Sequence, residues 1–127
     1  MSTIAVDLQS YSRAKSGTTT SWVGTASANS RSVYPIPEGI IIRVFHPDAT
    51  AIVTQLFYVE VRLVGKEYIT SSNISSSYEF GDTPGRAIKN YLELLVDKLT
   101  WLEKHKAELS PSIRQDLHLL QSYVRIV

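Results

Sequence analysis

Cysteine is missing from this 127-residue chain, which excludes disulfides, thiolate catalysis and cysteine-based zinc sites. An excess of one charge is missing too. Thirteen Lys and Arg oppose twelve Asp and Glu, and the net charge of +1 supplies little general attraction for nucleic acid or an acidic membrane. No apolar run approaches the ~20 residues of a membrane-spanning helix, and no secretory signal is visible. We therefore expect a cytoplasmic protein that does not associate with membranes.

Motifs for catalysis and cofactor binding are also scarce. The phosphate-loop pattern GxxxxGK[ST], the dinucleotide pattern GxGxxG and the GxSxG elbow are all absent. None of the three histidines is spaced from another as metal ligands on a helix are. Glu93 and Asp97 are interpreted as part of a solvated helix face. An enzyme with its site at His46-Pro47-Asp48 is the least favoured alternative, because the proline makes this stretch an ordinary turn at the exit of a strand. We predict a non-enzymatic protein without a cofactor or metal.

The composition, with 43% hydrophobic and 20% charged residues, is that of a globular chain. Its length predicts one domain over residues 1–127. We divide it into a Ser/Thr-rich N-terminal segment (1–35), a β-sheet region (40–80) and a helical hairpin (84–124). Short strands are expected within the first segment, at 4–8 and around 21–26, where Trp22 is the large aromatic residue.

The middle of the chain carries the clearest β pattern. Phe57, Val59, Val61 and Leu63 alternate with more polar residues, which predicts a strand with one apolar face. Gly65-Lys66 then separates this strand from a second one at 67–71, and a glycine in the first loop position suits a two-residue hairpin turn with positive φ.

Three further β features flank this hairpin. Tyr78-Glu79-Phe80 is expected to form a third short strand, after a polar stretch at 71–77 that is either a loop or a frayed strand edge. Ile40–Phe45 is nearly all apolar and predicts a strand buried on both faces. The proline-rich run 34–39 is expected to act as a stop signal before it.

The last third of the sequence predicts two helices. Thr83-Pro84 is a helix start, with Thr83 or Asp82 as the cap, and the helix is expected to reach residue 106. Its apolar stripe steps by four and three residues, with two aromatic residues widening it: Ile88, Leu92, Leu95, Leu99 and Leu102, with Tyr91 and Trp101.

Ser110-Pro111 repeats the start signal, and the second helix carries a stripe of Ile113, Leu117, Leu120 and Val124. The short connection predicts roughly antiparallel helices. The fold class is therefore α+β: an antiparallel sheet of four to five strands packed by a C-terminal two-helix hairpin.

One stretch, 57–95, resembles the HicB-type antitoxin domain. In that family a β-β-β-α unit carries a pattern like G-D-T-x-x-x-A-x-x-N where the helix opens. Here the pattern reads Gly81-Asp82-Thr83-Pro84-Gly85-Arg86-Ala87-Ile88-Lys89-Asn90. The resemblance implies a sheet that docks a partner protein, and it does not extend to DNA binding.

We predict a protein-binding or regulatory module, antitoxin-like in role, that also self-associates because edge strands invite pairing with another chain. The residues expected to contact partners are Tyr58, Glu60, Arg62, Lys66, Tyr68 and Trp22. The alternative is a single-stranded nucleic-acid-binding protein, in which Arg43, Arg62 and Lys66 join Tyr58 and Tyr68 on one exposed sheet face. The other orientation open to Tyr68 is toward the core.

Overall fold

The computed structural model describes residues 31–44 and 49–127. The elements in this part, in chain order, are β1 (Arg31–Ile36), β2 (Ile41–Val44), β3 (Ala49–Val53), β4 (Phe57–Val64), β5 (Glu67–Ser72), β6 (Tyr78–Gly81), α3 (Pro84–Lys104), the 3₁₀ turn η1 (Lys106–Glu108), α4 (Pro111–Gln121) and β7 (Val124–Ile126). The strands predicted at 4–8 and 21–26 lie outside the described residues.

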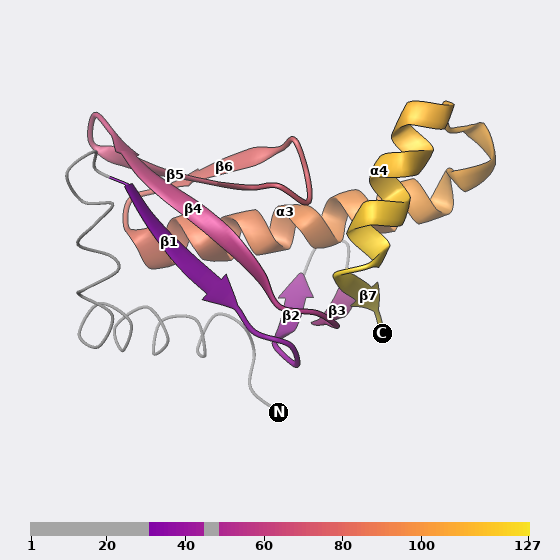
Figure 1. Cartoon of the computed structure of the whole chain (residues 1–127), viewed down its shortest axis with the longest axis horizontal. Coiled ribbons are helices and arrows are strands. Elements are labelled where there is room, and N and C mark those ends of the chain that lie inside the picture. Colours follow the sequence, from indigo (N-terminus) through magenta and orange to yellow (C-terminus); the bar gives the residue numbers. More distant parts are fainter. Residues whose placement is uncertain (1–30, 45–48) are drawn as a thin grey trace.

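The α+β class is confirmed, with antiparallel strands followed by a C-terminal pair of helices. The strands belong to two sheets. Sheet A has the order β1-β4-β5-β6, and sheet B has the order β2-β3-β7. The long helix α3 lies along one face of sheet A and also contacts all three strands of sheet B (Figure 1). A single helix therefore joins the two sheets into one hydrophobic core.

The predicted β4-β5 hairpin is confirmed. Val64 pairs with Glu67 across the turn, and the register continues to Val59 opposite Ser72. Gly65 has a φ of +65°, in the region that a side chain disfavours and that this turn requires. Strand β6 is confirmed as the third strand, paired with β5.

The expectation of a stop at the proline-rich run is wrong for its first residues. Tyr34, Pro35 and Ile36 belong to β1, which pairs with β4 along its whole length. Among the described strands, β1 lies at one edge of sheet A. An edge strand tolerates proline because its outward side needs no ladder amide. Tyr34 and Ile36 are buried, so the burial of alternate side chains outweighs the local cost of the proline.

Strand β2 is buried on one face, not on both. Ile42 and Val44 are buried, whereas Arg43 points to solvent. Its neighbour β3 was not anticipated, and neither was β7. Val124, expected on the last helix, lies in β7 opposite Val53 and is fully buried there.

Helix α3 begins as predicted. The Thr83 side chain accepts a hydrogen bond from the Arg86 amide at 3.1 Å, and Pro84 occupies the first helical position. The whole predicted leucine and isoleucine stripe is buried, together with Tyr91. Trp101 is the exception, because its side chain is exposed and stacks on the ring of His105, with the ring centroids 4.2 Å apart.

Helix α4 begins at the Ser110 cap and buries Leu117 and Leu120, whereas Ile113 is exposed. The end of α4 lies beside the end of α3, where the Gln121 amide donates to Glu103 Oε2 at 3.1 Å. The first turns of α4 extend away from both sheets (Figure 1). Leu117 and Leu120, toward the end of α4, therefore reach the core, whereas Ile113 in its first turn does not.

Candidate binding face on the four-stranded sheet

The two faces of sheet A differ sharply. Phe57, Val59 and Val61 point to the inner face, against α3, and are buried. The alternate residues of β4 point to the opposite side, which we call the outer face. Strand pairing extends this face across the sheet, and its central members are Arg31, Val33, Tyr58, Glu60, Arg62, Ile69, Ser71, Tyr78 and Phe80.

Three aromatic side chains stand on the outer face. Tyr58 on β4 is 54% exposed, Tyr78 on β6 is 59% exposed, and Phe80 on β6 is 40% exposed. The rings of Tyr78 and Phe80 meet edge to face, with their centroids 5.7 Å apart. Large aromatic side chains this open are costly to leave in water and mark a surface that a partner can cover.

Charges on the outer face centre on Glu60. Its Oε2 lies 3.2 Å from Arg31 Nε, and its Oε1 lies 3.9 Å from Arg62 Nε. Two guanidinium groups therefore share one carboxylate. All three side chains are at least a third exposed, so these pairs add little to stability. Their main effect is to fix where the positive and negative charges lie on the outer face, and they contribute little to holding the sheet together.

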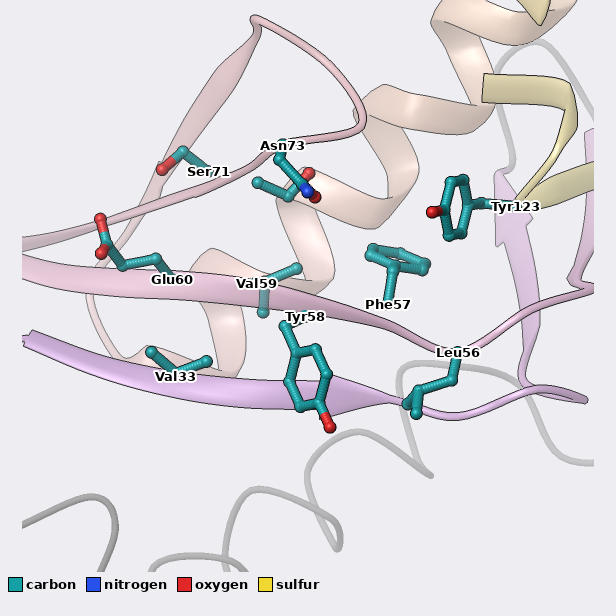
Figure 2. Close-up of a pocket in the computed structure, with 10 residues that line it drawn as sticks. Val33, Leu56, Phe57, Tyr58, Val59, Glu60, Ser71, Asn73 and Tyr123 are labelled. Atoms are coloured by element: carbon teal, nitrogen blue, oxygen red, sulfur yellow. The ribbon is translucent and has the colours of Figure 1, made fainter. Parts of the chain in front are cut away.

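Two depressions mark this side of the molecule, and both include Ser71. The first has a volume of about 370 Å³ and is lined by Arg62, Ile69, Ser71, Tyr78 and Phe80. The second, about 490 Å³, lies toward the other end of β4 and includes Tyr58, Asn73 and Tyr123. Figure 2 shows Phe57 directed toward Tyr123 and Tyr58 on the opposite side of β4. The Phe57 and Tyr123 rings both line this depression and meet edge to face, with their centroids 5.8 Å apart.

The free edge of β6 is protected by its own neighbours. The Glu79 carboxylate accepts a hydrogen bond from the Phe80 amide at 3.1 Å, and the Asn90 side chain donates one to the Phe80 carbonyl at 2.8 Å. Both backbone groups of Phe80 are thus satisfied within the chain. A partner strand pairing with this edge would have to displace both bonds, so the outer face is a better docking surface than the β6 edge.

Four of the predicted contact residues lie where a partner could reach them. Tyr58, Glu60 and Arg62 share the outer face, and Lys66 is exposed in the adjoining turn. Tyr68 lies apart from these four. It pairs with Leu63 on the inner-face side and is partly buried against the core, which is one of the two orientations that the sequence allows. The two-residue turn already implied this register, because pairing Val64 with Glu67 places Tyr68 opposite Leu63.

Other predicted residues lie elsewhere. Arg43 belongs to β2 of sheet B, so it cannot join Tyr58 on one sheet face. Trp22, His46 and Asp48 fall outside the described residues. Tyr78 and Phe80 were missed as contact residues. Their alternation with Glu79 was visible in the sequence, but only the pairing of β6 with β5 shows which face they share with Arg62.

Titratable groups elsewhere give little chemistry. Burial raises the pKa of the Tyr91 hydroxyl, although its hydrogen bond with Ser72 works in the opposite direction. Burial likewise raises the pKa of Tyr34. Glu93 pairs with Lys89 at 3.4 Å. Within residues 31–44 and 49–127, no three His, Asp or Glu side chains gather as metal ligands do.

No helix in the described part of the chain is long and apolar enough to cross a membrane. No protein-family model matches the sequence, and neither a curated protein nor a solved structure matches it. The outer face must therefore be interpreted from its own chemistry.

Proposed function

We propose that this protein is a non-enzymatic protein-binding module of regulatory role and that its contact surface is the outer face of sheet A. The observation that carries the proposal is that exposed Tyr78 and Phe80 line one depression with Arg62, while exposed Tyr58 stands on the same face of the sheet. Tyrosine and arginine are enriched in the residues that dominate protein interfaces. The rigid sheet also fixes their spacing before a partner arrives, which lowers the entropic cost of binding.

The antitoxin-like role is part of this proposal and rests on the sequence resemblance. Gly81, Ala87 and Asn90 of the resembling motif lie where β6 meets α3, and their contacts explain them structurally. They position the face without belonging to it. The resemblance therefore supplies a class of partner, a toxin-like protein, and the outer face supplies the surface.

The decisive experiment is affinity capture with the full chain in lysate of the source cells, quantified by mass spectrometry. The test variant combines Tyr78→Ser and Phe80→Ser. The control is Trp101→Ser, which removes an aromatic side chain that is 56% exposed on α3, away from the outer face. We expect one set of proteins to be captured by the wild type and by the control but lost by the test variant. Equal capture by all three would contradict the proposed surface.

Single-stranded nucleic acid is the second candidate, and the same three aromatic side chains favour it. Exposed rings on a sheet can stack unpaired bases, and the Arg62 guanidinium can contact a phosphate. The charge of the outer face favours nucleic acid less, because Glu60 lies between the two arginines of the face. Fluorescence anisotropy with labelled oligothymidylate and oligouridylate of about ten nucleotides tests this candidate. Binding that weakens with added salt and is lost on Tyr58→Ala would favour it over protein binding.

A further inference from the structure

The depression beside Arg62 has an unusual balance of groups. Arg62 is the one charged residue among those that line it, and the others are Ile69, Ser71, Tyr78 and Phe80. The depression therefore combines an apolar lining, made by Ile69 and the rings of Tyr78 and Phe80, with one cation and two hydroxyl groups. Such a site suits a ligand that presents an anion next to an apolar group.

The Arg62 guanidinium has hydrogen-bond donors left for a further acceptor. Among the described residues its one ion-pair contact is Glu60 Oε1, at 3.9 Å from Nε, which is too long for a hydrogen bond. Glu60 is meanwhile held more closely by Arg31, at 3.2 Å. A guanidinium has five donors in a planar fork that matches a carboxylate. Within residues 31–44 and 49–127 this fork therefore has no close acceptor, and a carboxylate of a partner can supply one.

We propose that this depression is the anchor subsite of the outer face and that it holds an acidic side chain of the partner protein beside an apolar one. The inference rests on the proposed function and names the chemistry of the partner. The partner carboxylate pairs with Arg62, and the neighbouring apolar side chain covers Ile69 and the Tyr78–Phe80 pair. Ser71 and the Tyr78 hydroxyl are available to the second carboxylate oxygen.

Charge favours a protein carboxylate here over the phosphates of a nucleic acid. A nucleic acid strand gains affinity by placing several phosphates against several cations. The outer face offers two guanidinium groups, and Glu60 lies between them. Glu60 does not line the depression, so a single carboxylate that enters it meets Arg62 as the one charged group there. One guanidinium beside an apolar lining therefore suits the binding of one acidic side chain.

The probe is a phage library of random peptides of about seven residues, selected against the immobilised full chain. Enriched peptides are then synthesised with a fluorescent label and titrated against four proteins: the wild type, Arg62→Gln, Arg62→Lys and the control Arg43→Gln. Arg43 is exposed on β2 of sheet B, so its replacement removes the same charge away from the outer face.

We expect enriched sequences with Asp or Glu next to an aromatic or aliphatic residue. Arg62→Gln should weaken their binding about tenfold or more, and Arg43→Gln should leave it unchanged. Arg62→Lys should recover part of the loss, because a lysine keeps the charge without the fork. Replacing the peptide carboxylate by its amide should weaken binding to the wild type but not to Arg62→Gln.

Four results would overturn the anchor: enriched peptides without acidic residues, binding that ignores Arg62→Gln, a library that yields no binder, or an oligouridylate whose binding is lost on Arg62→Gln. Peptides that depend on Tyr78 and Phe80 but not on Arg62 would overturn the anchor and leave the outer face as the proposed surface. Peptides that depend on none of the three would overturn both.

Discussion

Gly81 and Ala87 bring strand β6 and helix α3 into backbone contact. A Cβ atom built on Gly81 would lie 2.3 Å from the Ala87 nitrogen and 2.7 Å from the Ala87 Cα, far inside van der Waals distance. Ala87 is itself fully buried. The glycine is needed here for close approach, so that the helix can lie directly on the sheet and present Tyr78 and Phe80 on the other side.

Gly81→Ala should therefore destabilise the protein by about 1–3 kcal/mol or more, as overpacking at a rigid contact does. The helix backbone cannot move aside as a flexible side chain could. Gly65→Asn is the matched control, because a Cβ at Gly65 meets nothing within 4 Å and asparagine tolerates a φ of +65°. Urea denaturation of both variants measures the difference. Equal stabilities would mean that β6 and α3 are not in contact at this point.

The centre of α3 provides a test of the core. Leu95 and Leu99 are fully buried between the helix and the sheets. Replacing either by alanine should lower the free energy of unfolding by about 2–5 kcal/mol. Leu119→Ala, at a leucine that is 42% exposed on α4, should cost less than about 0.5 kcal/mol. A similar loss at all three positions would show that the stripe of α3 is not the core.

The structure at the start of α3 shows which of two candidate residues caps the helix, a choice that the sequence left open. Thr83 caps the Arg86 amide, whereas Asp82 forms an exposed ion pair with the Arg86 side chain at 3.4 Å. Thr83→Ala should therefore cost about 1 kcal/mol. Asp82→Ala should cost about 0.5 kcal/mol or less, since exposed pairs contribute little. Thermal unfolding followed by circular dichroism compares them, and a larger loss for Asp82→Ala would make it the cap.

The sequence predicted those elements whose structure depends on residues close together in the chain. The β4-β5 hairpin needs only an alternating strand and a glycine turn, and α3 needs only a cap and an apolar stripe. Strand β7 was missed because its pairing with β3 joins distant parts of the chain, as with Val53 and Val124. Strand β3 pairs locally with β2, but its sequence, with Thr50 as the one polar residue, shows little alternation of polar and apolar side chains. A three-residue strand carries too little pattern of its own to be distinguished from the end of a helix.

The candidate face could be predicted only in part for the same reason. Alternation within β4 placed Tyr58, Glu60 and Arg62 on one side without knowledge of the fold. Tyr78 and Phe80 reach that side through the register of β6 on β5, across a serine-rich loop that gives no register signal. Thus the half of the face that lies on one strand was predictable, and the half that depends on strand pairing was not.

Thr70 offers a test of a buried polar atom. Its side chain is fully buried on β5, and within the described residues its hydroxyl oxygen has no hydrogen-bond partner. Burying an unpaired hydroxyl costs free energy, and valine has nearly the same shape without it. Thr70→Val should leave the stability unchanged or raise it by about 1 kcal/mol. Chemical denaturation measures this, and a clear loss of stability would mean that the hydroxyl finds a partner in solution.

Self-association is the remaining prediction, and it concerns the whole chain. Among the described strands, sheet A ends in β1 (Arg31–Ile36), which follows in sequence the N-terminal residues that contain Trp22. An edge strand can pair with a second chain, and a tryptophan is a strong anchor at an interface. We expect light scattering during size exclusion to give the mass of a dimer or a larger assembly. Trp22→Ser should shift that mass toward the monomer, whereas Trp101→Ser, at the exposed tryptophan of α3, should not.

A monomeric wild-type protein would rule out self-association. An assembly that survives Trp22→Ser would exclude Trp22 as its anchor and would leave the β1 edge and the outer face as the surfaces to test, by the same measurement on Tyr58→Ser.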